Sequence, residues 1–126
     1  MSYRVTLIPG DGIGPEVIDA ARLVLEATGL KFEWDVQPAG AEALARFGTP
    51  IPEALLESIR NNGVGLKGPI TTALGTGFRS ANVGIRQSLN LWANLRPVRT
   101  RVGVESRYED VDLVVVRENT EGLYTG

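Results

Sequence analysis

The first 29 residues constrain the fold most, because they predict a strand, a glycine turn and a helix in direct succession. The apolar run Tyr3–Ile8 is short and ends at a Pro-Gly pair, which is typical of a buried parallel strand. Pro15 follows the turn at the first helical position, where its fixed φ and missing N–H are tolerated. Apolar residues then recur at helical spacing until Gly29, which is expected to end the helix. This unit favours a layered α/β fold.

The glycine turn itself does not match a dinucleotide-binding fingerprint. Its glycines stand at positions 10, 12 and 14, whereas the G-x-G-x-x-G pattern needs its third glycine where Pro15 stands. The turn can still lie near a ligand, because helix N-termini attract anions. A purely structural turn is the slightly favoured interpretation.

The remaining pattern continues the α/β alternation. It predicts strands at 32–37, 64–66, 91–98 and 112–117, and helices at 41–47, from Pro52 to Asn61, and through 83–89. Segment 99–105 is expected to extend the strand before it or to pair with it. The run 112–117 is the strongest strand signal, and its apolar centre predicts neighbours on both sides, which a longer parent protein is expected to supply. Trp92 is expected in the core rather than as a stacking platform.

Composition narrows the chemistry. The 126 residues suffice for one domain, and no apolar run approaches the roughly 18 residues of a membrane span. The N-terminus becomes polar and glycine-rich by Gly10, so no signal peptide is expected. Without Cys or His, a catalyst here must use Tyr, Lys, Asp or Glu, or groups from elsewhere. The net charge of −2 argues against nucleic-acid binding.

Charge is distributed unevenly along the chain. The 47 residues from Ser58 to Val104 contain no Asp or Glu, although the whole chain has 15 acids. The same stretch carries seven cations: Arg60, Lys67, Arg79, Arg86, Arg96, Arg99 and Arg101. This pattern favours a site for a small, multiply charged anion. The alternative is a solvated face, which is favoured for Arg79, Arg99 and Arg101.

Four motifs in order resemble the β-decarboxylating hydroxyacid dehydrogenases, the isocitrate/isopropylmalate dehydrogenase family. They are IPGDGIGPEV at 8–17, LKGP at 66–69, RSANVGIRQSLNLWANLRPV at 79–98 and VVRENTEGLYTG at 115–126. The resemblance covers the whole chain and implies an isopropylmalate dehydrogenase-like layered α/β fold, incomplete here, with a largely parallel sheet and flanking helices. Ser80, Asn82 and RENTEG resemble the isocitrate branch, because a hydroxyl and an amide can donate to a third carboxylate. Isopropylmalate dehydrogenase, homoisocitrate dehydrogenase and a non-catalytic regulatory subunit stay open.

The resemblance implies oxidative decarboxylation of isocitrate to 2-oxoglutarate and CO₂, with hydride transfer to NAD⁺ or NADP⁺. It assigns Tyr124 as the acid that protonates the product carbon, which requires neighbouring cations such as Arg117. The implied substrate-binding residues are Ser80, Asn82, Arg86, Arg96 and Arg117. The implied cofactor-binding residues are Lys67, Thr71, Thr72 and Asn82.

The resemblance also implies what lies outside this chain. Residues 1–98 would belong to a large domain, and 99–126 would begin a small domain with the dimer contacts. Mg²⁺ or Mn²⁺ would be held by residues absent here, because no carboxylate cluster at metal spacing follows Ser58. The chain alone is expected to be inactive, to expose apolar surface and to belong to a homodimer or larger oligomer. Its expected location is cytoplasmic in a bacterium or archaeon and mitochondrial in a eukaryote.

Overall fold

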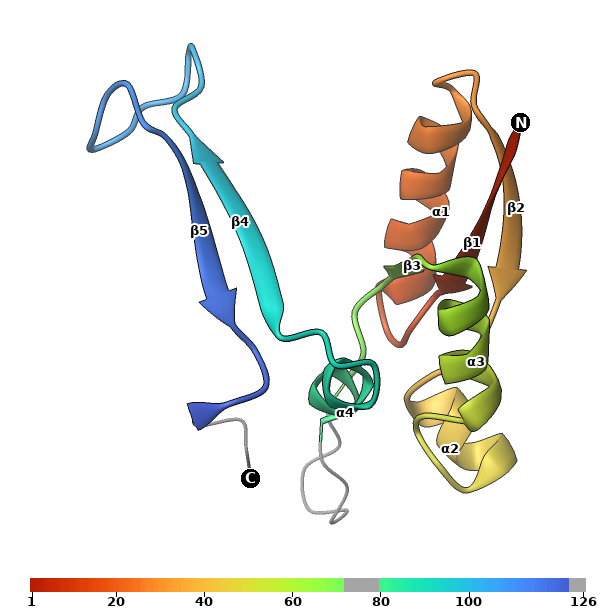
Figure 1. The fold of residues 1–126 in the computed structure, drawn as a ribbon. Coiled ribbons are helices and arrows are strands. Elements are labelled where there is room, and N and C mark those ends of the chain that lie inside the picture. Colours follow the sequence, from red (N-terminus) through yellow and green to blue (C-terminus); the bar gives the residue numbers. More distant parts are fainter. Residues whose placement is uncertain (72–79, 123–126) are drawn as a thin grey trace.

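The computed structural model of the chain describes residues 1–71 and 80–122 (Figure 1). Helices and strands alternate in the order β1 (Ser2–Ile8), α1 (Gly14–Glu26), β2 (Lys31–Val36), α2 (Ala41–Phe47), α3 (Glu53–Asn62), β3 (Gly65–Lys67), α4 (Ala81–Ser88), β4 (Ala93–Arg99) and β5 (Asp112–Glu118). The predicted order is confirmed, and most ends differ from the prediction by one or two residues.

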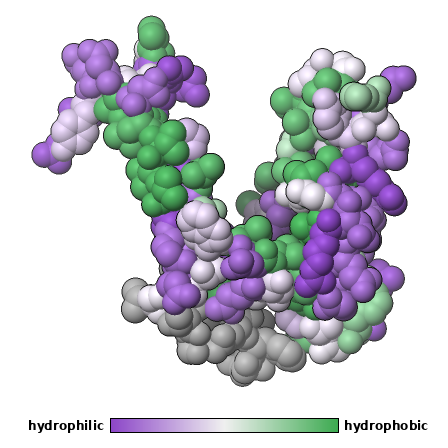
Figure 2. Space-filling view, in the orientation of Figure 1, coloured by the Kyte–Doolittle hydropathy of each residue, from purple (hydrophilic) through white to green (hydrophobic). Residues whose placement is uncertain are grey.

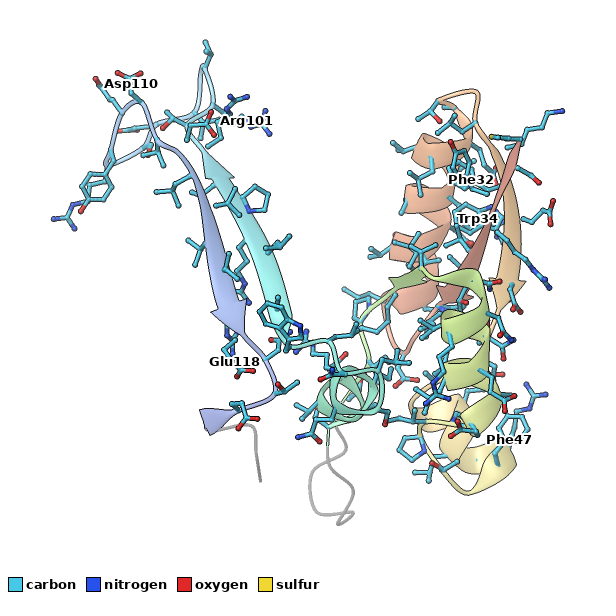
Figure 3. The ribbon with its side chains drawn as sticks, in the orientation of Figure 1. Phe32, Trp34, Phe47, Arg101, Asp110 and Glu118 are labelled. Atoms are coloured by element: carbon cyan, nitrogen blue, oxygen red, sulfur yellow. The ribbon has the colours of Figure 1, made fainter. Side chains whose placement is uncertain are left out.

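The first three strands form a parallel sheet in the order β2-β1-β3. Helices cover both of its faces, as a parallel sheet requires. On one face, Trp34 of β2 donates to Glu26 of α1 at 2.8 Å and stacks on Phe32 (Figure 3). On the other face, the Thr6 hydroxyl of β1 lies 2.6 Å from the Ser58 hydroxyl of α3. The predicted α/β class with a parallel sheet and flanking helices is confirmed.

Local sequence explains how these helices begin and end. Pro15 stands in the first turn of α1, and Pro52 occupies the N-cap position of α3. Gly63 ends α3 in the left-handed conformation at φ 72°, and Gly48 ends α2 at φ 71°. The helix predicted to reach Gly29 ends at Glu26, because the chain turns at 27–29 before β2.

The core lies between β1, α3 and α4. A cluster of buried side chains joins these elements: Ile8, Ala39, Leu55, Ile70, Ala81 and Ile85. The glycine at position 84 lets α4 pack closely against Ile51, because a Cβ there would stand 2.4 Å from the Cδ1 atom of Ile51. The core therefore fixes α4 beside the end of β3, where Lys67 stands.

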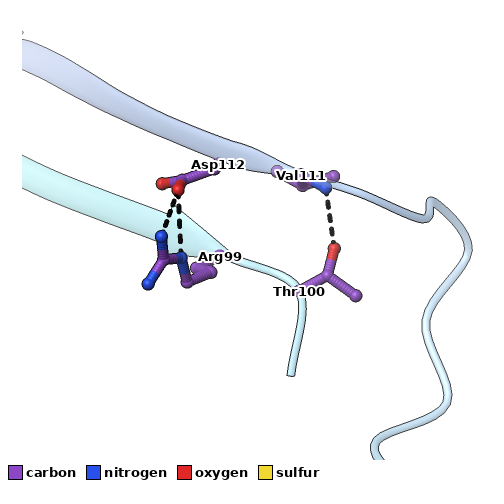
Figure 4. A network of polar contacts seen from close by, with 4 residues as sticks. All are labelled: Arg99, Thr100, Val111 and Asp112. Carbon is purple, nitrogen blue, oxygen red and sulfur yellow. Dashed lines mark hydrogen bonds and ion pairs between the residues drawn. The ribbon is translucent and has the colours of Figure 1, made fainter. Parts of the chain in front are cut away.

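Strands β4 and β5 form a separate antiparallel hairpin that extends away from α4 (Figure 1). At its far end, Thr100 accepts a bond from the N–H of Val111 at 2.9 Å, and Arg99 forms an ion pair with Asp112 (Figure 4). Hydrophobic side chains cover much of the visible face of the hairpin (Figure 2). The exposed apolar surface predicted from the sequence is present here, with Leu95, Val98, Leu113, Val114, Val115 and Val116 all exposed.

Strand β5 pairs only with β4 among the described residues, and the second neighbour that its apolar pattern predicts was expected from a longer protein. Two sequence expectations are wrong in the described part of the chain. Segment 99–105 does not continue the strand, since β4 ends at Arg99 and turns follow. Trp92 is not in the core, because 60% of its surface is exposed at the start of the hairpin. No helix among the described residues is long and apolar enough to cross a membrane.

Candidate functional site

The carboxyl ends of β1 and β3 lie side by side, where ligands gather in open α/β sheets. The chain after β1 hydrogen-bonds to the chain after β3: the Asp11 N–H donates to the Pro69 carbonyl at 2.8 Å. The Gly68 N–H donates to the Ile8 carbonyl, also at 2.8 Å. Backbone hydrogen bonds therefore hold the glycine turn and the segment 67–71 together.

Glycine is required where these two segments meet. A Cβ on Gly10, which has φ +77°, would stand 2.0 Å from the Pro69 carbonyl oxygen. A Cβ on Gly68 would stand 2.2 Å from the Pro9 carbonyl oxygen. The glycines of the turn thus allow two backbones to approach, as the structural interpretation of the motif predicts.

A pocket of about 170 Å³ opens between β3 and α4, and three of the predicted site residues line it. Lys67 comes from the end of β3, and Asn82 and Arg86 come from α4 one helical turn apart. The rest of the lining is largely apolar and includes Ile8, Ile59, Ile85, Leu89 and Leu91. The pocket combines two cations and an amide with a low-polarity wall, which suits a small anionic group.

The two cations of the pocket influence one another. Burial lowers the pKa of Lys67, and the nearby Arg86 guanidinium lowers it further. The Lys67 Nζ donates to the Gly68 carbonyl at 2.6 Å, and an ammonium has three protons to donate. An anion bound here would offset the repulsion between Lys67 and Arg86 and accept bonds from both.

Arg96 and Arg117 lie on one face of the hairpin. Arg96 pairs with Val115, and Arg117 pairs with Asn94, which is two residues before Arg96. Because alternate residues share a face, the two arginines are diagonal neighbours, and the Cα atoms of such neighbours lie roughly 7–8 Å apart. The acids of these strands, Asp112 and Glu118, fall on the opposite face by the same alternation. This face therefore presents two cations without an acid at the paired positions.

The structure separates the other cations of the acid-free stretch from these groups. Arg60 forms an exposed ion pair with Glu53 at 2.7 Å, and Arg99 pairs with Asp112. Arg101 is exposed near the tip of the hairpin (Figure 3). The solvated-face interpretation is thus confirmed for Arg99 and Arg101.

Several predicted site residues stand near the pocket or outside the described range. Thr71 is exposed just after the buried Ile70, and Ser80 occupies the N-cap position of α4. Asn82 donates to the Ile70 carbonyl at 3.5 Å. Thr72 and Tyr124 lie outside the described residues, as does Arg79.

Sequence reasoning missed two polar residues whose hydrogen bonds connect distant segments of the chain. The Asp11 carboxylate accepts from the N–H groups of Ala41 and Thr71. Asn119, only 6% exposed, donates from its backbone to the Trp92 carbonyl at 2.9 Å. An aspartate after a glycine and an asparagine after a strand are common turn signals, so neither position was distinctive.

The described residues do not form a metal site. No three acidic, His or Cys side chains among residues 1–71 and 80–122 gather closely enough to hold an ion. No chemical step is therefore assigned to a metal held by this part of the chain.

Comparisons with known proteins agree with the resemblance that the motifs predict. The isocitrate/isopropylmalate dehydrogenase family model matches residues 4–126. The crystal structure of isocitrate dehydrogenase from Methylococcus capsulatus is 56% identical with a TM-score of 0.89, covering 98% of this chain and 37% of that protein. The mitochondrial NAD isocitrate dehydrogenase catalytic subunit 5 of Arabidopsis thaliana is 47% identical over 121 residues, or 96% of this chain and 32% of that protein.

A relative of the other branch is about equally similar. The chloroplastic 3-isopropylmalate dehydrogenase of Solanum tuberosum is 46% identical over 123 residues, which is 98% of this chain and 34% of that protein. The chain thus spans about a third of the length of the curated relatives it matches. The resemblance predicted from the four motifs is confirmed, and the chain belongs to the isocitrate/isopropylmalate dehydrogenase family.

Proposed function

We propose that this chain forms the substrate-recognition part of an isocitrate dehydrogenase that reduces NAD⁺. In this reaction the C2 hydroxyl of isocitrate gives up its proton while C2 transfers a hydride to NAD⁺. The resulting β-keto acid loses CO₂, and a proton is added to the carbon that carried the lost carboxylate, which gives 2-oxoglutarate. The main support for this proposal is that Lys67, Asn82 and Arg86 line one pocket. The two arginines that share one face of the hairpin support the same reading.

Isocitrate has three carboxylates, so its site needs several fixed cations. We assign Arg86, Arg96 and Arg117 to the carboxylate clamp. A guanidinium stays charged at any working pH and pairs with a carboxylate through two parallel bonds. Ser80 and Asn82 are assigned to the third carboxylate, because both can donate to it.

The cofactor would lie beside the end of β3. We assign Lys67, Thr71, Thr72 and Asn82 to the nicotinamide side of the site, since this is the strand end where dinucleotides bind in open α/β sheets. NAD⁺, when bound, would accept the hydride from C2. The choice of NAD⁺ over NADP⁺ rests on the name of the Arabidopsis relative.

The returning proton is assigned to Tyr124. A phenol with an ordinary pKa near 10 needs cationic neighbours to transfer a proton readily at neutral pH, and Arg117 stands seven residues earlier in the motif. Tyr124→Phe should abolish formation of 2-oxoglutarate while leaving isocitrate binding within about twofold, because the clamp is intact.

A second candidate is isopropylmalate dehydrogenase, which the Solanum relative favours. That substrate has an isopropyl group in place of the third carboxylate. Ser80 and Asn82 would then face an apolar group that offers them nothing to donate to. A site that can hydrogen-bond a polar group of its substrate disfavours an analogue that lacks this group, so these two residues favour isocitrate.

The deciding experiment is a substrate panel on a family-length protein that contains this chain. Isocitrate, isopropylmalate and homoisocitrate are each assayed for reduction of NAD⁺ and NADP⁺. Isocitrate should give the highest kcat/KM. A higher value with isopropylmalate would replace this proposal by the second candidate, and binding of isocitrate without turnover would indicate a regulatory subunit.

The clamp is tested on the hairpin, which offers its own control. Arg96→Leu should reduce kcat/KM for isocitrate roughly 10- to 100-fold, the cost of a charge-assisted bond of about 1.5–3 kcal/mol. Arg99→Leu removes the same charge from the same strand but from the opposite face. It should change kcat/KM less than about twofold, because it breaks only an exposed ion pair. Equal losses in both variants would reject the clamp.

The relatives also suggest an assembly and a compartment. The Arabidopsis relative is named as a catalytic subunit and as mitochondrial. We propose a homodimer or larger oligomer, and a mitochondrial location if the source is eukaryotic. Size-exclusion chromatography with light scattering on the family-length protein would test the assembly.

A further inference from the structure

We propose that Asp11 is a positioning residue that holds residues 69–71, called the Thr71 segment below, in place for the dinucleotide. This inference rests on the proposed function, because it assigns Thr71 to the nicotinamide side of the site. It concerns a different residue from those that contact substrate or cofactor. Asp11 lies in the turn after β1, and Thr71 follows β3.

The Asp11 carboxylate connects two segments far from it in sequence. Its Oδ2 accepts from the Thr71 N–H at 3.3 Å, and its two oxygens accept from the Ala41 N–H at 3.2 Å each. The backbone N–H of Asp11 also donates to the Pro69 carbonyl at 2.8 Å. The peptide planes on both sides of Ile70 are therefore fixed by one residue.

The surrounding chain leaves space for this carboxylate. A Cβ on Gly40 would stand 2.3 Å from the Asp11 Oδ2 atom and 2.8 Å from the Ile70 Cγ2 atom. Only glycine at this position lets the start of α2 approach the carboxylate and Ile70 together. Gly40 has φ +74°, so its conformation and its lack of a side chain are both used.

Capping of α2 alone does not explain this arrangement. A capping residue precedes its helix directly and bonds to the first turn, whereas Asp11 is 30 residues before Ala41. The same oxygen that accepts from Ala41 also accepts from Thr71, which is 60 residues away. The carboxylate thus acts as a bridge, with α2 as the fixed support and the Thr71 segment as the part held.

The bridge makes a specific kinetic prediction for the family-length protein. Asp11→Ala should raise KM for NAD⁺ at least about fivefold, because the Thr71 segment loses its charge-assisted bond. KM for isocitrate should change less than KM for NAD⁺, since the clamp arginines lie on other elements and only the long 3.5 Å bond from Asn82 to the Ile70 carbonyl links an assigned substrate residue to this segment among the described contacts. Asp11→Asn should recover most of the loss, because one amide oxygen placed at the Oδ2 position still accepts from both N–H groups.

Two control variants separate positioning from general destabilisation. Asp19→Ala removes the same charge from an exposed position on α1, and should leave both KM values unchanged. Gly40→Ala should raise KM for NAD⁺ as Asp11→Ala does, because the new Cβ displaces the carboxylate. Gly48→Ala has a similar φ of +71° but nothing within 4 Å of the new Cβ. It should lower stability without changing KM for NAD⁺.

Hydrogen exchange provides a readout that does not depend on turnover. Peptides that contain Thr71 and Ala41 should exchange faster in Asp11→Ala than in Asp19→Ala. The inference is overturned if Asp11→Ala keeps the KM for NAD⁺, if it raises both KM values equally, or if exchange at Thr71 is unchanged. An unsubstituted protein that cannot oxidise isocitrate would instead refute the proposed function, and this result is recognised before any variant is compared.

Discussion

The substitution Ser58→Ala tests the polar contact between α3 and the sheet. The Ser58 hydroxyl donates to the Asp35 Oδ2 atom at 2.7 Å and lies 2.6 Å from the Thr6 hydroxyl, which is fully buried. Asn62 donates to the same Thr6 oxygen at 2.9 Å. Removing the Ser58 hydroxyl leaves the Thr6 proton without its acceptor, and Asp35 loses one of its donors while it keeps those from Gln37 and Asn62. We expect a loss of about 1–3 kcal/mol in the free energy of unfolding at pH 7.

The loss should depend on pH, because the Ser58 hydroxyl is the largest cause that lowers the pKa of Asp35. The Gln37 amide contributes next. A carboxyl with a lowered folded-state pKa stabilises the fold above its unfolded pKa, and this stability is lost as pH falls through the folded pKa. Ser58→Ala brings the folded pKa closer to the unfolded value. Its cost should therefore be largest above about pH 5 and should shrink toward about pH 2.

The assay is urea unfolding of the family-length protein, followed by circular dichroism at pH 7 and in acid. Ser2→Ala is the matched control, because its exposed hydroxyl donates to Glu33 at 2.6 Å. It should cost less than about 0.5 kcal/mol at either pH. The reasoning is refuted if Ser58→Ala costs no more than this control, or if its cost is the same at both pH values.

Four further substitutions are measured by the same unfolding assay. Gly10→Ala should cost about 3 kcal/mol or more, because its Cβ would stand 2.0 Å from a carbonyl oxygen, whereas Gly12→Ala, with φ +59° and open space, should cost about 1–2 kcal/mol. Leu55→Ala should cost about 2–5 kcal/mol, because this fully buried side chain leaves a cavity. Arg99→Ala should cost less than about 1 kcal/mol and still less in high salt, because its ion pair is exposed. Equal costs at Gly10 and Gly12, a cost below 1 kcal/mol at Leu55, or a salt-independent loss at Arg99 would each contradict the corresponding argument.

The sequence predicted elements well where local pattern decides them. The prolines at the starts of α1 and α3 and the glycines at the ends of α2 and α3 act on their own turn of helix, so these boundaries followed from residue type. The pairing of β4 with β5 as a separate sheet was not predictable in this way. Strand pairing depends on register between segments far apart, and the apolar run of β5 predicts burial without naming what covers it.

The candidate site was predicted from family motifs, which name residues but not their geometry. The pattern could not reveal that Lys67 and Arg86 would line one pocket, because β3 and α4 are separate segments of the sequence that tertiary packing brings together. Asp11 was missed for a related reason. Its partners are backbone N–H groups 30 and 60 residues away, and a backbone group leaves no signature in the sequence.

The arginines of the proposed clamp come from α4 and from the β4–β5 hairpin, so the distances between them depend on how the helix and the hairpin are joined. Arg86 belongs to α4, and its carbonyl accepts from the Leu91 N–H at 2.8 Å where the chain enters the hairpin. Asn119, just after Arg117 on β5, returns to this point by donating to the Trp92 carbonyl at 2.9 Å and to the Leu91 carbonyl at 3.4 Å. Because the end of β5 is tied to the end of α4 here, the spacing of Arg86 and Arg117 depends on a buried amide. Under the proposed function, the recognition of a tricarboxylate would then depend on Asn119 as well as on the three arginines assigned to the clamp.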